Sequence, residues 1–200
     1  MILALTGSSV DGPLYRDVVD LAHHSPGPLD GIVTVWSAYG AAVFALLMVV
    51  GWWQARKTGP VAGITALAVP VAVLVAFGTD AGLKLLVREQ RPCHSLPFST
   101  LERCPGPGDW SFPSNHTALA AAAAVALFFV SRRLGVVASV CAVAMAASRV
   151  WVGVHYPHDV LAGALVGGLV AFLVMTALRR WPRGLAGRLA RTRLRPLLVS

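Results

Sequence analysis

The sequence has 200 residues, of which 56% are hydrophobic and only 13% charged, and its mean hydropathy is +0.67. A soluble domain of this length has too little interior for so much apolar surface, whereas a protein with several membrane spans needs no such interior. The net charge of +8 could suit nucleic acid, but the basic residues crowd the C-terminal segment and the gaps between apolar runs. That distribution is typical of membrane topology and lipid contact, so we expect one membrane domain, residues 1–200, and no nucleic-acid partner.

An N-terminal surface segment, residues 1–30, comes first. Within it, residues 13–24 alternate apolar and charged positions at helical spacing, which predicts a short amphipathic helix on the membrane surface. An ordinary packed N-terminal helix fits the same pattern equally well. A Ser-Pro-Gly-Pro sequence at 25–28 then ends the helix.

Five apolar segments follow, each long enough or nearly long enough to cross a bilayer. They cover residues 32–53, 61–83, 114–130, 134–150 and 160–178. The predicted fold is therefore an all-α integral membrane bundle of five, or at most six, spans. In the fifth segment, Gly163, Gly167 and Gly168 predict close packing between helices.

The basic residues predict which side of the membrane each gap faces. Eleven of the 17 Lys and Arg fall after the first, third and fifth spans, the last group beginning at Arg179 and continuing into a basic tail, residues 181–200. By the positive-inside rule this side is cytoplasmic. The N-terminus, the loop at 92–113 and the polar stretch at 148–159 then face the outside.

Three polar clusters meet at this outer face, and the first is cationic. Lys84, Arg88 and Arg91 are four and three residues apart, so on a continuous helix they would share one face. Three such cations repel one another unless an anion lies among them, although a positive rim on lipid headgroups is an alternative. Asp80, four residues before Lys84, could pair with it and reduce the cost of burying its charge.

The second cluster is the sequence Phe-Pro-Ser-Asn-His at 112–116, where the third span begins. A proline near the first helical position leaves the next backbone N–H groups free, which favours an anion site. His116 falls within the first turn, beside that site.

The third cluster is the stretch at 148–159. Pro157 suits the first turn of the fifth span, which places His155 just before the helix and Asp159 just inside it. A carboxylate beside an imidazole can fix its tautomer and leave the other nitrogen free as a nucleophile. Arg149 suits a pair of phosphate oxygens, and His158 is the weaker histidine candidate.

Together the clusters predict phosphate chemistry without a metal or other cofactor, because cations and N–H donors surround two imidazoles. A zinc site is the alternative use of the histidines. The adjacent cations oppose a divalent metal and few carboxylates are at hand, so we rank zinc lower.

These motifs closely resemble the type 2 phosphatidic-acid phosphatase superfamily of membrane lipid phosphatases. The family signature reads here as Lys84 to Arg91-Pro92, then Pro-Ser-Asn-His at 113–116, then Ser148-Arg149 to His155 and Asp159. The order and spacings match over residues 80–165. One departure is Asn115, where glycine is usual; asparagine keeps the backbone donor and tolerates unusual angles.

The resemblance implies a role for each residue. His155 would attack phosphorus and become phosphohistidine, Asp159 would orient it, and His116 would protonate the leaving group and then activate water. The residues that would hold the phosphate are Lys84, Arg91, Ser114, Asn115 and Arg149.

The expected substrate is a membrane lipid with a phosphate or diphosphate head. The short outer loop resembles that of bacterial undecaprenyl-diphosphate phosphatases, so we favour a polyprenyl diphosphate and a bacterial plasma membrane. Phosphatidylglycerophosphate and phosphatidic acid are alternatives, and a non-catalytic lipid-phosphate binding or transport protein is an alternative of another class. We predict inert packing for Cys141 and a disulfide between Cys93 and Cys104 in the outer loop.

Overall fold

The structure is a computed structural model that describes residues 7–180 and 195–198. Its helices are α1 (Ser8–His23), α2 (Gly27–Tyr39), α3 (Ala41–Ala55), α4 (Pro60–Val87), α5 (Pro92–Ser95), α6 (Asn115–Phe128), α7 (Arg132–Trp151), α8 (Pro157–Arg179) and α10 (Arg195–Leu198). These two ranges contain no strand. Helices suit a bilayer because each segment satisfies its own backbone hydrogen bonds. The predicted all-α class is confirmed.

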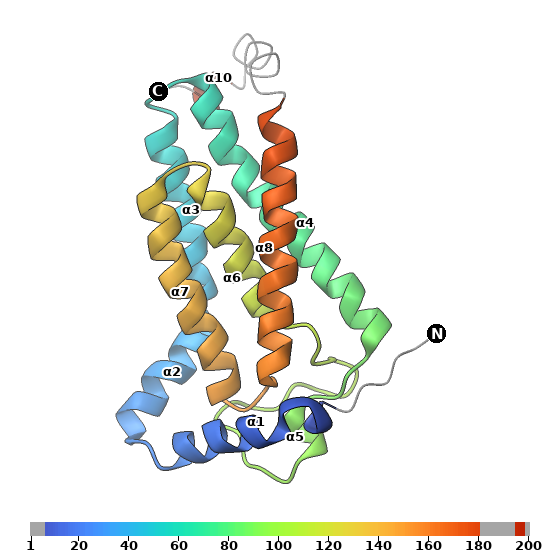
Figure 1. Ribbon diagram of the computed structural model, residues 1–200. Coiled ribbons are helices and arrows are strands. Elements are labelled where there is room, and N and C mark those ends of the chain that lie inside the picture. The colour runs from blue at the N-terminus through green and yellow to red at the C-terminus, as the bar shows by residue number, and fades with distance from the viewer. Residues whose placement is uncertain (1–6, 181–194, 199–200) are drawn as a thin grey trace.

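Helix α6 lies in the middle of the bundle, with α4, α7 and α8 packed around it (Figure 1). Its buried side chains are mostly alanine, which lets the neighbouring helices approach closely. A Cβ on Gly163 of α8 would lie 2.5 Å from the carbonyl oxygen of Ser114, and one on Gly167 would lie 2.1 Å from that of Ala118. The close packing predicted for these two glycines is confirmed, and it brings the first turn of α8 against the start of α6.

The number of membrane spans is only partly supported. Among the residues that the structure describes, three segments are long and apolar enough to cross a bilayer: Pro60–Ser95, Arg132–Trp151 and Pro157–Arg179. The pair α2 and α3, bent by 56°, makes a fourth if it counts as one span. Helix α6 is apolar but has 14 residues, fewer than the roughly 20 that a crossing needs. The expectation of five or six spans therefore stays a prediction.

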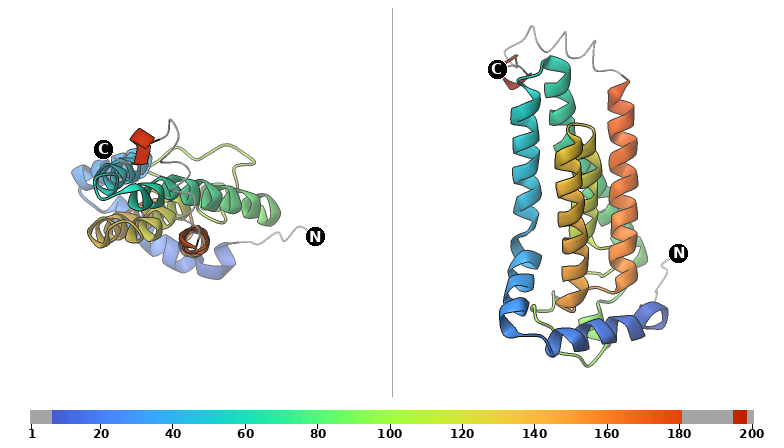
Figure 2. Two further views of the ribbon diagram at one scale, coloured as in Figure 1. Left: turned by 90° about the horizontal axis from the view of Figure 1, so that it is seen from above. Right: turned by 60° about the vertical axis from the view of Figure 1, so that its left-hand side comes forward.

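Helix α1 lies across one end of the bundle, beneath the turn that joins α7 to α8 (Figure 2). Tyr15 of α1 is fully buried, donates a hydrogen bond to the carbonyl oxygen of Gly153 at 2.9 Å, and packs its ring 5.4 Å from that of Tyr156. The contacts agree with a packed N-terminal helix, and contact of α1 with a membrane surface stays a prediction.

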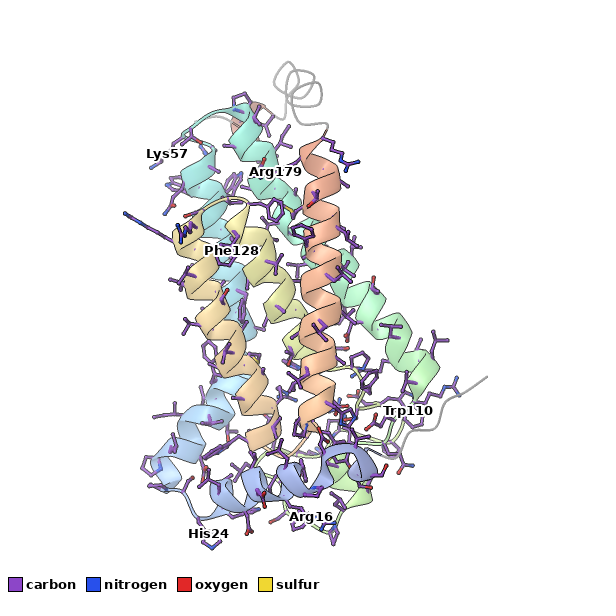
Figure 3. All side chains as sticks on the ribbon, viewed as in Figure 1. Arg16, His24, Lys57, Trp110, Phe128 and Arg179 are labelled. Atoms are coloured by element: carbon purple, nitrogen blue, oxygen red, sulfur yellow. A yellow bond between two sulfur atoms is a disulfide. The ribbon has the colours of Figure 1, made fainter. Side chains whose placement is uncertain are left out.

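The two ends of the bundle carry the groups that the topology prediction uses. Lys57 and Arg179 lie at the end away from α1, whereas Arg16 lies on α1 and His24 directly follows it (Figure 3). Most of the basic tail, with residues 181–194 and 199–200, lies outside the described residues. The single-domain division and the assignment of sides therefore stay predictions.

Candidate active site

His155 lies in the turn between α7 and α8 and is 1% exposed. Its Nδ1 is 3.3 Å from Oδ2 of Asp159, and its Nε2 is 3.1 Å from Nη1 of Arg91. A guanidinium can only donate, so the network assigns Nε2 as the acceptor and puts the proton on Nδ1, facing the carboxylate. In this tautomer the lone pair of Nε2 points toward the cationic side of the site.

Asp159 is completely buried, and its partners come from three segments. Its Oδ2 accepts a hydrogen bond from the Tyr156 N–H at 2.8 Å and a short one from the Ser111 hydroxyl. Its carbonyl oxygen accepts the N–H of Ser114 at 3.0 Å, which ties the start of α6 to the first turn of α8. The carboxylate is therefore held in place before any substrate arrives.

Arg91 and Lys84 form one cationic side of the site. Arg91 donates to the carbonyl oxygens of Asp109 (2.8 Å) and Val154 (3.0 Å) and to the Asp109 carboxylate (3.0 Å). Lys84, at the end of α4, lies 3.8 Å from the same carboxylate. Both cations are largely buried, whereas the Asp109 side chain is 52% exposed. An exposed acid thus occupies donors that could hold a phosphate.

Arg149, in the last turn of α7, is the third cation. It is 5% exposed, and its Nη1 donates to the Ser37 hydroxyl in a short hydrogen bond and to Oε2 of Glu102 at 3.1 Å. Its Nε is buried and has no hydrogen-bond partner among the described residues. Part of its donor fork is therefore available for another acceptor.

The start of α6 supplies Ser114, Asn115 and His116. Ser114 is fully buried, and its hydroxyl accepts a hydrogen bond from Thr117 at 3.2 Å. The first N–H groups of a helix have no acceptor within it, so the first turn of α6 offers backbone donors. Within residues 7–180 and 195–198, no hydrogen bond engages the half-buried imidazole of His116.

Burial and the surrounding charges hold the pKa of His155 well below its usual value, and burial has the larger effect. The charges, in order of their effect, belong to Arg91, Arg149, Lys84 and His116. The residues that the sequence assigned to separate clusters therefore act on one imidazole, which stays neutral. Burial alone would raise the pKa of Asp109, but the hydrogen bond and charge of Arg91 and the charge of Lys84 bring it below its usual range.

His158 points to the other side of the first turn of α8. Its Nδ1 lies 2.8 Å from Oδ1 of Asp11, and its Nε2 lies 3.0 Å from Oε1 of Glu89. Neither contact reaches the cations. The structure therefore separates His158 from the cations Lys84, Arg91 and Arg149, in agreement with its lower rank in the sequence.

Two groups of side chains have the spacing of metal ligands. Glu89, His158 and Asp159 offer ligand atoms within 4.8 Å of one another, and so do Cys93, His94 and Cys104. The second group cannot use its thiols, because Cys93 and Cys104 form the predicted disulfide. In the first group both ring nitrogens of His158 already face carboxylates, so metal binding there would require loss of a ring proton.

One expectation about the first cluster was wrong. Helix α4 ends at Val87, and Arg88 has a left-handed backbone with φ of 51°, so the predicted shared face of three cations does not form. Arg88 is exposed and donates to the carbonyl oxygen of Leu85. Asp80 is buried and its charge acts on Lys84 as expected, but the acid within 4.0 Å of Lys84 among the described residues is Asp109.

Sequence reasoning missed the residues that form hydrogen bonds or ion pairs with the predicted site residues and with His158. They are Asp11, Ser37, Glu89, Glu102, Asp109 and Ser111. The last three lie in the loop between the first two motifs, where isolated acids and serines usually indicate only a solvated surface. Two acids in a loop flanked by cationic motifs were the available signal.

The PAP2 superfamily matches residues 64–183, which include all three polar clusters. Undecaprenyl-diphosphatase BcrC of Bacillus subtilis is 32% identical over 164 residues, 80% of each chain. The undecaprenyl-diphosphatase of Sulfolobus acidocaldarius is 32% identical over 152 residues, 72% of this chain and 68% of its own.

A solved structure has the same fold. It is the crystal structure of the first transmembrane PAP2 type phosphatidylglycerolphosphate phosphatase from Bacillus subtilis. It superposes with a TM-score of 0.68 at 27% identity and covers 88% of each chain.

Proposed function

Because the chain belongs to the PAP2 superfamily, we propose that it hydrolyses a polyprenyl diphosphate, with undecaprenyl diphosphate as the favoured substrate, to the monophosphate. That it is a membrane lipid phosphatase follows from its named relatives and its apolar helices. The choice of substrate is supported by two relatives that are both named undecaprenyl-diphosphatases. This activity replaces the non-catalytic binding or transport protein that the sequence left open.

The observation that carries the mechanism is the tautomer of His155. Its Nε2 accepts from Arg91 and its Nδ1 donates to Asp159, so the lone pair points at the place where three cations can hold a phosphate. In the proposed first step, Nε2 forms a bond to the terminal phosphorus while the bond from phosphorus to the bridging oxygen breaks. Asp159 stabilises the positive charge that develops on the ring.

The proton balance assigns two roles to His116. It donates a proton to the bridging oxygen as the lipid monophosphate leaves, and it then takes a proton from the water that attacks the phosphohistidine. That second step breaks the nitrogen–phosphorus bond, releases inorganic phosphate and restores neutral His155. No redox partner is needed.

The phosphate oxygens are assigned to five residues. Lys84, Arg91 and Arg149 supply charge, and Ser114 and Asn115 supply donors at the start of α6. Asn115 contributes its backbone N–H, which substitution of the usual glycine retains. No metal or other cofactor takes part in this scheme.

Phosphatidylglycerophosphate is the second candidate substrate. It is favoured by the likeness to the solved phosphatidylglycerolphosphate phosphatase over 88% of the chain. Phosphatidic acid has no such support. We place the site on the extracytoplasmic face of a bacterial plasma membrane, since Arg56, Lys57, Arg132, Arg133 and the basic tail suit the cytoplasmic side.

The test is phosphate release by the purified protein in detergent. The panel contains undecaprenyl diphosphate, phosphatidylglycerophosphate and phosphatidic acid, each at several concentrations. We expect the highest kcat/KM with the diphosphate, loss of turnover by at least about a thousandfold in His155→Ala, and normal turnover in His24→Ala. Acid-labile, base-stable labelling of the wild type by a ³²P-labelled substrate would identify phosphohistidine.

Two results would each overturn one part of the proposal. Equal turnover by wild type and His155→Ala would exclude the nucleophile. A preference for phosphatidylglycerophosphate would keep the mechanism and replace the substrate. Persistence of activity in EDTA, together with inhibition by vanadate, separates the scheme from a zinc enzyme.

A further inference from the structure

His158 connects three parts of the chain that are distant in sequence. Asp11 of α1 accepts two hydrogen bonds from it, from the backbone N–H at 2.6 Å and from ring Nδ1 at 2.8 Å. Glu89, between α4 and α5, faces the other ring nitrogen at 3.0 and 3.2 Å through its two oxygens. The ring also stacks on those of Tyr156 and Phe112, with centroids 5.5 and 5.9 Å away.

The contacts specify the charge of the ring. Ionised carboxylates only accept hydrogen bonds, so each ring nitrogen of His158 must donate, and a ring that donates twice is an imidazolium. Glu89 is fully buried, and a buried carboxylate needs a cationic partner. In the described part of the chain, His158 is the cation within 4.0 Å of Glu89 and of Asp11.

The same contacts fix the first turn of α8. The helix begins at Pro157, so the N–H of His158 is one of the first-turn donors that need an acceptor from outside the helix. Asp11 provides that acceptor from α1, as an N-cap side chain would. The next residue is Asp159, whose carboxylate faces His155 and also lies 3.5 Å from Nε2 of His158 through its other oxygen.

We infer that His158 is a positioning residue: its imidazolium, held between Asp11 and Glu89, fixes the first turn of α8 and so keeps Asp159 on Nδ1 of His155. This role rests on the proposed function, since it acts through the nucleophile. Displacement of a catalytic group by about 1 Å can lower a rate by about a hundredfold. His158 itself touches neither the phosphate cations nor His155 in any recorded contact, so its effect must pass through Asp159.

The kinetic experiment uses variants that keep one contact at a time. The amide of His158→Asn can replace Nδ1 toward Asp11, and that of His158→Gln can replace Nε2 toward Glu89. We expect each to lower kcat on undecaprenyl diphosphate about tenfold, with KM within about twofold and the protein still folded in detergent. His24→Asn is the matched control, because His24 directly follows α1, is exposed, and its ring is hydrogen-bonded to the carbonyl oxygen of Asp20, away from the site.

A double-mutant cycle shows whether the effect passes through Asp159. In an Asp159→Asn background, His158→Asn should change kcat less than about twofold, since the carboxylate that it positions is gone. Full additivity of the two losses would overturn the inference, as would wild-type kcat in a folded His158→Asn protein. Exchange of both partners for amides, in Glu89→Gln with His158→Gln, should recover part of the activity lost in either single variant.

A measurement without substrate separates this inference from the proposed function. In ¹⁵N-histidine-labelled protein, one ring should show two N–H signals at the assay pH, and His158→Asn should remove both. Absence of such a ring would overturn the assignment of His158 as an imidazolium. So would the finding that the purified wild type binds one equivalent of zinc and that Glu89→Gln loses it. If the wild type shows this ring but hydrolyses no lipid diphosphate, the substrate proposal fails, but the imidazolium of His158 between Asp11 and Glu89 is retained.

Discussion

His155 and the cations proposed to bind phosphate, Lys84, Arg91 and Arg149, belong to one site, but they differ in the residues that contact them. His155 and Asp159 are at most 1% exposed, and their partners, the Tyr156 N–H, Ser111 and Arg91, are themselves buried. Arg91 and Lys84 instead share the Asp109 carboxylate, which is 52% exposed, and Arg149 pairs with Glu102 from the same loop. The proposed nucleophile is therefore arranged in advance, whereas on the proposed mechanism a phosphate must displace the loop acids Asp109 and Glu102 to reach the cations.

The largest expected effect comes from a substitution beside His155, where the side chains are already arranged. Asp159→Asn removes the charge that orients His155 and stabilises its ring, so kcat should fall by about a hundredfold or more. KM should change little, because the cations are untouched. Steady-state kinetics on folded protein tests this, with Asp109→Asn as the matched loss of one carboxylate. Equal effects of the two variants would contradict the division of the site.

A smaller effect of the opposite sign is expected on the cation side. Asp109 is ionised at neutral pH because Arg91 and Lys84 hold its pKa below the usual range, and it therefore competes with anions. Asp109→Asn should strengthen inhibition by inorganic phosphate about threefold, the scale of a partly exposed ion pair. Asp17→Asn, an exposed acid on α1, serves as the control. Weaker inhibition in Asp109→Asn would show that Asp109 helps to hold phosphate.

The smallest effect concerns pH. The pKa of His155 is lowered, first by burial and then by Arg91, so its nucleophilic neutral form is lost only as pH falls through that lowered value. Between pH 7.5 and 6.5 the rate of phosphoenzyme formation should fall by less than about a fifth, whereas an ordinary histidine, with a pKa near 6.5, would lose nearly half of its neutral form. Quenched-flow labelling measures the rate, corrected by a ³¹P titration of the substrate. Loss of about half the rate near pH 6.5 would show that the pKa of the nucleophile is that of an ordinary, solvent-exposed histidine.

The sequence could predict that the two proposed catalytic groups lie together, because their spacing is local. His155 and Asp159 are four residues apart across a helix start, and Pro157 indicates where that helix begins. Close packing at Gly163 could be predicted for the same reason, since small residues in an apolar run have few other uses.

The supporting groups could not be predicted, because their partners are far away in the chain. Asp11 is 147 residues from His158, and Glu102 is 47 from Arg149. Helical periodicity also failed at Arg88, where the chain leaves α4 one turn earlier than a continuous helix to Pro92 would require. Helical periodicity applies only within a helix, and Arg88 is neither a glycine nor a proline that would indicate the end of α4.

The contact between Asp11 and His158 also has a consequence for biosynthesis. The ribosome makes α1 first and α8 among the last of the described helices. Asp11 is therefore synthesised long before its partner His158. Contacts between such distant residues form late in folding, because the long loop between them must close first. Partly inserted chains would then hold a nucleophile that is not yet oriented, and lipid hydrolysis would begin only when the final helix has joined the bundle.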